Sequence, residues 1–290
     1  MPELQEVSLT NQFQGLQRFP EGGVSRPFFM PAFFCVGIIG QNRPMTLTAI
    51  LSALPQEQHG LIELLRQPRQ LSHAGRDFWQ GELHGRPVLL ALSKIGKVAA
   101  ATTATALIER FGVGRIVFTG VAGGLGEGVN VGDVVVATDF VQHDIDASPL
   151  FPRYEVTLYG KTCFDGDLAL TALLFKAAAT ALASERASLA FPGARVHQGL
   201  IASGDRFVCG ASESRALRAA LAQAGHAVLA VEMEGAAVAQ VCLDYGVPFA
   251  AVRTISDRAD DSAHVDFPSF IDQVASRYAR AIVENFLDLL

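Results

Sequence analysis

The segment AVLAVEMEGAAVAQVCLDYGVPFAAVRTIS, residues 227–256, predicts the fold because it reads as a strand, a helix and a second strand in succession. Both predicted strands, 227–234 and 249–256, are apolar along most of their length. Such runs are typical of parallel strands that are buried on both faces, and the helix between them, 235–246, supplies the crossover connection. The segment therefore predicts one unit of an α/β sheet.

The same alternation of strands and helices extends over the chain from Met45 onward. Further strands are predicted at 46–54, 87–92, 115–120, 133–140 and 196–204. Further helices are predicted around Leu61–Leu65, over 97–111, 167–189 and 212–224, and from Pro268 to the C-terminus. We expect a single α/β domain over residues 45–290, with a central mixed, largely parallel β-sheet flanked by helices.

Residues 1–44 differ from the rest because closely spaced prolines and glycines interrupt any regular element. We expect an irregular N-terminal extension there. Its acidic and polar start does not match a secretory signal. Its most apolar stretch, 32–40, is shorter than the roughly 20 residues that span a bilayer. The sequence therefore predicts neither a targeting segment nor a membrane partner.

Composition narrows the class of protein further. Half of the 290 residues are hydrophobic, the net charge is −6 and the pI is about 5.6. No cluster of Lys and Arg offers the electrostatic attraction that a nucleic acid partner requires. The four cysteines are far apart, and neither they nor the histidines have the spacing of metal ligands. We expect no metal, no disulfide framework and a cytoplasmic location.

A glycine-rich segment, FTGVAGGLGEGVNVGD at 118–133, begins inside one predicted strand. A dinucleotide-binding loop of this kind opens into a helix, whereas this one leads into another strand, so we expect no such cofactor. The glycines permit a ligand to approach main-chain N–H groups closely, and they equally fit a tight β-turn. The sequence leaves both interpretations open.

Carboxylates follow two of the predicted strands, at the strand ends where α/β sheets bind ligands. Glu57 is a candidate, although the first turn of a helix also favours an acid. Glu234 stands where strand meets helix, and it can accept hydrogen bonds from vicinal hydroxyls, as on a ribose, or serve as a cap in a salt bridge. We expect a structural role for Glu232, as a partner for a backbone or basic group.

Arg253 and Asp257 are four residues apart and follow the apolar run FAAV, in what we expect to be a loop. Their spacing lets them converge on one ligand without pairing with each other. Asp257 is a candidate general acid if its surroundings raise its pKa. The alternative is an Asx-turn or a helix N-cap.

Taken together, these segments resemble the 5′-methylthioadenosine/S-adenosylhomocysteine nucleosidases of the purine nucleoside phosphorylase superfamily. The motifs are SKIGKVAAATTATALIERF (93–111), TGVAGGL (119–125), VGDVVVATDFVQHD (131–144), GLIASGDRFV (199–208), AVEMEGAAVAQVC (230–242) and VPFAAVRTISDRAD (247–260). The resemblance covers the chain from Met45 to its end and implies a nucleoside phosphorylase-like fold. It also implies a homodimeric hydrolase that takes a purine nucleoside, a 5′-thioadenosine, and releases adenine in methionine salvage.

The resemblance implies the catalytic residues. Glu57 matches the family's base that activates water, and Asp257 matches the acid that protonates N7 of the leaving purine. Arg253 and Ser256 match residues that support the water and the acid.

The resemblance also implies the substrate contacts. Glu234 and Met233 match the ribose contacts, with the carboxylate on the sugar hydroxyls. Phe207 and Val208 match residues that stack on the base and offer it main-chain hydrogen bonds, and Gly123 falls near base and ribose. Loss of a purine passes through an oxocarbenium-like sugar, so a protonated acid at the base and an ionised carboxylate at the ribose suit the reaction.

Three alternatives remain open. Phe267 matches an aromatic residue of the 5′-thio pocket, but generic apolar side chains there do not separate this activity from that of a futalosine hydrolase. A purine nucleoside phosphorylase needs cationic donors for phosphate, and this chain has Phe118 and Val121 where phosphorylases tend to have Arg and Ser. Val121 also replaces a hydroxyl that many relatives carry. A nucleoside-binding module without turnover could dispense with Glu57 and Asp257.

Overall fold

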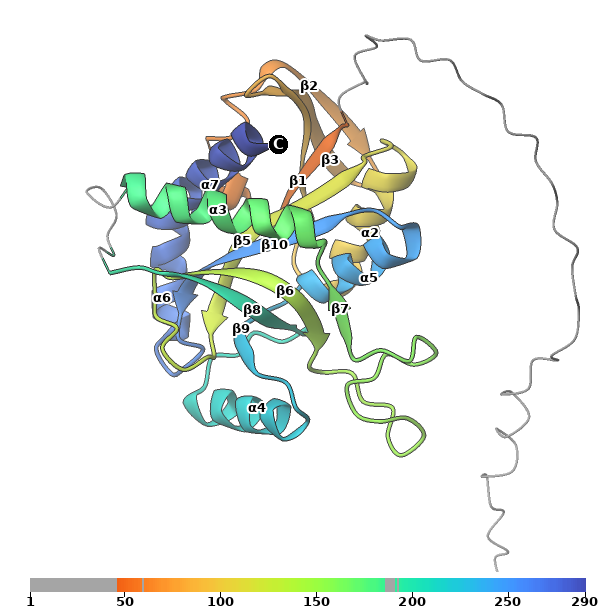
Figure 1. Ribbon diagram of the computed structural model, residues 1–290, viewed down its shortest axis with the longest axis vertical. Helices are drawn as coiled ribbons and strands as arrows, with labels where there is room; N and C mark the ends of the chain where they lie inside the picture. The colour runs from red at the N-terminus through yellow and green to blue at the C-terminus, as the bar shows by residue number, and fades with distance from the viewer. Residues whose placement is uncertain (1–45, 59, 186–190, 192) are drawn as a thin grey trace, which may run out of the picture. The chain divides into compact units, whose positions relative to one another are not determined.

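The computed structural model describes residues 46–290 except 59, 186–190 and 192 (Figure 1). The extension predicted over residues 1–44 lies outside the described residues, so it stays a prediction. The strands are β1 (Thr48–Ser52), β2 (Arg66–His73), β3 (Arg76–Leu83), β4 (Arg86–Leu92), β5 (Arg115–Gly124), β6 (Val134–Gln142), β7 (Cys163–Asp165), β8 (Val196–Ser203), β9 (Val228–Glu232) and β10 (Phe249–Asp257). The helices are α1 (Pro55–Gln58), α2 (Lys97–Glu109), α3 (Leu168–Glu185), α4 (Ala211–Gln223), α5 (Gly235–Tyr245), α6 (Ala263–Phe270), a π-helix (Ile271–Ala275) and α7 (Ser276–Leu289).

One mixed β-sheet forms the centre of this domain. Its strand order is β10-β6-β8-β9-β5-β1-β4-β3-β2, and β7 pairs with β6. Strand β10 also pairs with β5, so β5, β10, β6, β8 and β9 close into a ring. The pairs β1–β5, β5–β10, β6–β8 and β8–β9 are all parallel, whereas β5–β9 is antiparallel. The predicted α/β fold with a mixed sheet is confirmed.

Helices cover the sheet because its strands are apolar on both sides. In β5, Ile116 and Phe118 belong to the hydrophobic cluster that includes α2 and α5, whereas Val117 belongs to the cluster that includes α3 and α7. Residues 249–252 of β10 alternate between the two clusters in the same way. Figure 1 shows α2 beside α5 and α3 crossing α7. This two-sided burial is why the strands read as continuous apolar runs.

The helix predicted around Leu61–Leu65 is wrong. Only the four-residue helix α1 precedes this stretch, and turns follow it, in which the N–H groups of Leu61, Leu64 and Leu65 bond to carbonyls three residues earlier. Gly60 has a φ of 87°, a left-handed conformation that ends the helix. Leu61 and Leu65 are nevertheless buried in the core, so their apolar spacing reflects burial and not a helix.

The β2–β3 hairpin was not predicted. Most residues of β2 are exposed, and its sequence has no clear apolar alternation. Its turn has Ala74 and Gly75 at φ values of 49° and 67°, which is the backbone of a tight hairpin turn.

The end of the chain also differs from expectation in detail. The C-terminal helical run begins at Ala263, and Pro268 lies inside α6 instead of starting the helix. Arg253 and Asp257 lie within β10, which is buried along its whole length, so the strand predicted over 249–256 is observed and the loop expected directly after FAAV is wrong. Among the described residues, none of the helices combines the length and the apolarity needed to cross a membrane.

Candidate active site

A cavity of about 380 Å³ lies where α1, β5, β9, β10 and α6 meet. It is lined by nine of the ten residues predicted for the site: Glu57, Gly123, Phe207, Met233, Glu234, Arg253, Ser256, Asp257 and Phe267. The tenth, Val208, is buried and lines a small adjoining pocket together with Phe207, Met233 and Asp257. The fold thus brings together residues that are up to 210 positions apart in sequence, as Glu57 and Phe267 are.

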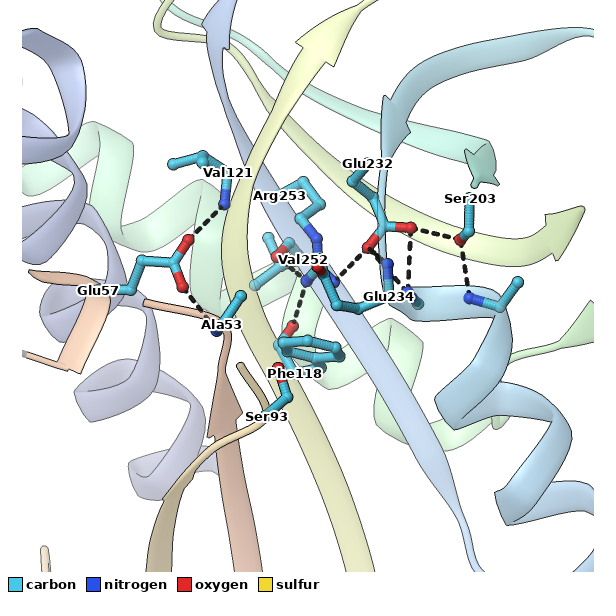
Figure 2. Close-up of polar contacts among 12 residues, drawn as sticks. Ala53, Glu57, Ser93, Phe118, Val121, Ser203, Glu232, Glu234, Val252 and Arg253 are labelled. Carbon is cyan, nitrogen blue, oxygen red and sulfur yellow. Dashed lines mark hydrogen bonds and ion pairs between the residues drawn. The ribbon is translucent and has the colours of Figure 1, made fainter. Parts of the chain in front are cut away.

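Glu57 projects from α1 and is fixed by main-chain donors (Figure 2). Its Oε2 accepts hydrogen bonds from the N–H groups of Ala53 (2.8 Å) and Leu54 (2.9 Å), and its Oε1 accepts one from Val121 N–H (3.1 Å). Burial raises the pKa of this carboxyl, although these backbone bonds and the charge of Arg253 act in the opposite direction. A buried carboxylate of raised pKa suits proton abstraction near neutral pH.

Gly120 explains how Glu57 reaches the cavity. A Cβ atom at this position would lie 3.1 Å from the Glu57 Oε1 atom. Glycine at this position therefore leaves room for the Glu57 carboxylate, a role that the sequence did not suggest.

Glu232 and Arg253 form a buried ion pair beside the cavity. The Glu232 Oε2 atom lies 2.8 Å from Arg253 Nη2, and the two side chains are 2% and 1% exposed. The guanidinium also donates to the Phe118 and Val252 carbonyls, each at 3.1 Å, and lies 4.1 Å from the centre of the Phe118 ring. Charge pairing and hydrogen bonds offset the cost of burying both ions.

The same Glu232 carboxylate holds the start of α5. It accepts the N–H groups of Glu234 (3.2 Å) and Gly235 (2.8 and 3.0 Å), and the Ser203 hydroxyl donates to it. The Ser203 oxygen in turn accepts the Ala236 N–H at 2.8 Å. The structural role expected for Glu232 agrees with these contacts, which Figure 2 draws between β9, β10 and α5.

Glu234 occupies the N-cap position of α5 and faces the cavity. Its Oε1 accepts the N–H of Gly96, which precedes α2, at 2.8 Å. Burial, followed by the negative charge of Glu232, raises the pKa of Glu234 to about 8. With a pKa close to neutral pH, this carboxyl gains or loses its proton when the nearby charge changes. The ring of Phe140 lies where a side chain on Gly235 would be, so this position must be a glycine.

Asp257 ends β10 and is almost completely buried. The Ser256 hydroxyl donates to its Oδ2 at 2.8 Å, and the Ala259 N–H donates to its Oδ1 at 2.8 Å. A Cβ on the facing Gly123 would come within 3.0 Å of Asp257 Oδ1 and of the Ala259 side chain. The absence of a side chain at Gly123 thus leaves room for this carboxyl at the cavity wall.

Two aromatic rings line the cavity from different elements. Phe207 lies between β8 and α4, Phe267 lies in α6, and their ring centres are 5.5 Å apart at an interplanar angle of 68°. Phe207 is 41% exposed, so part of its face is accessible. Rings in this arrangement can contact a flat heterocycle and an apolar substituent.

Sequence reasoning missed several members of the site. Gly96 supplies an N–H to Glu234, and Ala53, Leu54 and Ile95 line the cavity wall. The segment containing Ile95 and Gly96 was among the motifs, yet no role was given to it. Gly96 has a φ of 96°, and a glycine directly before a predicted helix was the available signal. In the part of the chain that the structure describes, no group of three His, Cys, Asp or Glu side chains is placed to hold a metal ion.

Known proteins resemble this chain over the whole described domain. A sequence model of the Phosphorylase superfamily matches residues 48–288. A 5′-methylthioadenosine/S-adenosylhomocysteine nucleosidase of Shewanella denitrificans is 34% identical over 255 residues, which are 88% of this chain and 99% of that protein. Both comparisons place the similarity on the domain that carries the cavity.

Solved structures agree with the sequence comparisons. The crystal structure of the 5′-methylthioadenosine/S-adenosylhomocysteine nucleosidase of Neisseria meningitidis, in complex with methylthio-immucillin-A, is 35% identical with a TM-score of 0.76, covering 85% of this chain and 100% of that one. A futalosine hydrolase mutant of Helicobacter pylori is 32% identical with a TM-score of 0.73, covering 84% and 100%.

Proposed function

Because this chain belongs to the 5′-methylthioadenosine/S-adenosylhomocysteine nucleosidase family of the phosphorylase superfamily, we propose that it hydrolyses the N-glycosidic bond of these two nucleosides. The products are adenine and a 5-thioribose. The observation that carries the proposal is that Glu57, Glu234 and Asp257 reach one cavity from three different elements. Three acids in these positions supply a base, a sugar contact and an acid for one reaction.

Glu57 takes the proton of the attacking water in this proposal. The water oxygen forms a bond to C1′ of the ribose while the bond from C1′ to the purine breaks. Backbone N–H groups on both carboxylate oxygens fix the orientation of Glu57, and the raised pKa of its carboxyl makes it a stronger base.

Asp257 gives its proton to N7 of the departing adenine, which receives the electron pair of the broken bond. Ser256 holds one carboxyl oxygen and the Ala259 N–H holds the other, so rotation of the acid is restricted. Protonation of the leaving group is the principal means of lowering the barrier to loss of a neutral purine.

Glu234 binds the ribose hydroxyls. With a pKa of about 8, this carboxyl is mainly protonated at neutral pH in the free site, which differs from the ionised state expected from sequence. Positive charge that develops on the sugar ring favours the ionised form of the same group, whose proton is released to solvent water. Glu234 therefore stabilises the transition state more than the ground state.

Water is favoured over phosphate as the nucleophile. Among the described residues that line the cavity, Arg253 is the only Lys or Arg, and its guanidinium is already paired with Glu232 and two carbonyls. Phosphate recognition requires cationic donors that are available to the anion. Phe118 and Val121 add no charge to this wall.

A futalosine hydrolase is the second candidate, since a mutant of the Helicobacter pylori enzyme is 32% identical, covering 84% of this chain and 100% of that one. The two activities differ in the 5′ substituent. Phe267, Leu54 and Ile95 are apolar and do not exclude either substituent on chemical grounds.

Adenine release separates these functions. 5′-Methylthioadenosine is incubated with the protein in phosphate-free buffer and with added phosphate, and free adenine is measured by chromatography. Equal rates in both buffers support the hydrolase, whereas a requirement for phosphate selects the phosphorylase. Binding of the nucleoside without adenine release selects the binding module, and cleavage of futalosine alone selects the second candidate.

Assembly and location complete the proposal: a cytoplasmic homodimer that acts in methionine salvage. Helices α2 and α5 pack side by side, and Val98, Leu243 and Tyr245 on them are exposed apolar residues. Segment 141–156 adds the exposed Leu150. Exposed apolar groups of this kind favour association. Light scattering is expected to give about twice the 30.9 kDa mass of the chain, and a monomeric mass would contradict the dimer.

A further inference from the structure

A second cavity, of about 570 Å³, shares a wall with the candidate active site. Ala53, Leu54 and Ile95 line both cavities. Ala53 is labelled in Figure 2, where it lies beside Glu57. The second cavity extends from this shared wall toward the turn of the β2–β3 hairpin.

The position of the shared wall bears on which part of a bound nucleoside would lie nearest to the second cavity. Asp257 lines both the active-site cavity and the small pocket around Val208. Ala53, Leu54 and Ile95, which form the shared wall, do not line that small pocket. Glu234 is held by Gly96, the neighbour of Ile95, and so lies near the shared wall. In the binding mode proposed above, with the purine at Asp257 and the ribose at Glu234, we assign the 5′ substituent to the shared wall, from which the second cavity is reached.

Arg76, at the start of β3, brings a positive charge to this cavity. Its Nε donates to the Thr103 hydroxyl at 2.6 Å, and its Nη1 and Nη2 donate to the carbonyls of Ala74 (2.9 Å) and Ala99 (3.2 Å). All three acceptors are neutral. A guanidinium has five N–H donors, so Arg76 is held in place while two donors and its full charge remain for a ligand.

Lys94 and Asp77 also line the second cavity. The Lys94 ammonium donates to the Gly75 carbonyl at 3.1 Å, and the Ser72 hydroxyl donates to Asp77 Oδ1 at 2.6 Å. Within the described residues, neither of them nor Arg76 takes part in a salt bridge. Two cations and one anion without ionic partners match a ligand that carries both a carboxylate and an ammonium group.

We propose that the second cavity binds the amino-acid end of S-adenosylhomocysteine, with its carboxylate at Arg76 and Lys94 and its ammonium group at Asp77. This inference rests on the proposed function and assigns a substrate preference to it. A methylthio group occupies only the apolar shared wall, whereas the homocysteine group extends beyond it to the three charged residues.

Substrate analogues test the inference on the wild-type protein. The ratio kcat/KM is measured for S-adenosylhomocysteine, for an analogue without the carboxylate and for an analogue without the amino group. Each deletion is expected to lower kcat/KM by about three- to tenfold, because charge-assisted contacts at a partly solvated site are worth about that much. Equal values for all three substrates would overturn the proposal.

A variant of Lys94 tests whether this side chain contacts the substrate carboxylate. In Lys94→Met, the ratio of kcat/KM for S-adenosylhomocysteine to that for 5′-methylthioadenosine is expected to fall about three- to tenfold, and removal of the substrate carboxylate should then cost little more. Lys176→Met is the matched control, because Lys176 is exposed on α3 and lines neither cavity. An unchanged ratio in a folded Lys94→Met protein also contradicts the proposal.

Failure of the proposed function is recognised separately. A wild-type protein that does not release adenine from 5′-methylthioadenosine in phosphate-free buffer fails that test whatever the second cavity binds. Calorimetric binding of S-adenosylhomocysteine and the two analogues then tests the second cavity without turnover. Equal dissociation constants would exclude the charged contacts.

Discussion

The carboxylate of Glu232 lies 2.8 Å from the guanidinium of Arg253, and both side chains are almost completely removed from solvent. This ion pair joins the end of β9 to the middle of β10 beneath the cavity. Because Glu232 also accepts the first N–H groups of α5, the pair positions Glu234 as well as the floor of the site. Its contribution is structural, since Arg253 is not available for an anionic ligand.

Removal of one member of this pair should destabilise the protein strongly. Glu232→Ala leaves the Arg253 charge buried without a partner, so we expect the free energy of unfolding to fall by about 3–5 kcal/mol in chemical denaturation. Asp165→Ala is the comparison, because it removes an exposed pair with Lys161 and should cost at most about 1 kcal/mol. Equal losses for the two variants would refute the account.

Asp257→Asn should abolish proton donation and preserve the fold. The amide keeps the size of the side chain but cannot protonate the purine, so we expect kcat for adenine release to fall about 10²- to 10⁴-fold. Asp165→Asn, at the exposed last residue of β7, should keep wild-type turnover. Near-normal turnover in Asp257→Asn would remove this residue from the role of acid.

Glu57→Gln should affect both turnover and stability. We expect kcat to fall about 10²- to 10⁴-fold, because the water loses its base. The free energy of unfolding should fall by about 1–3 kcal/mol, because the amide nitrogen cannot accept the backbone N–H groups that the carboxylate accepts now.

Glu63→Gln is the control for this variant, since Glu63 is exposed and does not line the cavity. Substrate binding by Glu57→Gln, measured by calorimetry, should persist. Loss of binding together with turnover would mean that Glu57 organises the site and is not its base.

Stability should depend on pH through Glu234. Between about pH 5 and pH 8 the folded protein keeps a proton on this carboxyl that the unfolded chain, with an ordinary pKa of 4.5, has lost. Unfolding therefore releases a proton, and stability falls as pH rises across this window, by at most about 1.4 kcal/mol per pH unit from this group. The raised pKa of Glu57 acts in the same direction.

Glu234→Gln removes the titrating group and should flatten this dependence. Denaturation curves of the variant and the wild type at several pH values between 5 and 8 measure the difference. Profiles that stay parallel would show that the Glu234 carboxyl titrates at its ordinary pKa.

Local patterns were sufficient for much of the fold. The strand, helix and strand of 227–256 are observed as β9, α5 and β10, because an uninterrupted apolar run and a helix bounded by Gly246 depend on neighbours in sequence. The β2–β3 hairpin was missed, since its exposed first strand carries no apolar period. The helix expected at Leu61–Leu65 was wrong, because apolar spacing alone does not distinguish a buried turn from a helix.

The sequence by itself determined the α/β class, the order of most elements and, through its motifs, a set of ten residues, nine of which line one cavity. Only the tertiary structure decided how those residues interact. Glu234 bonds to Gly96, 138 positions away. Glu232 pairs with Arg253 because their strands, β9 and β10, both pair with β5. Burial and charge at these distances set the protonation of each carboxyl, and neither quantity is encoded in any short stretch of the chain.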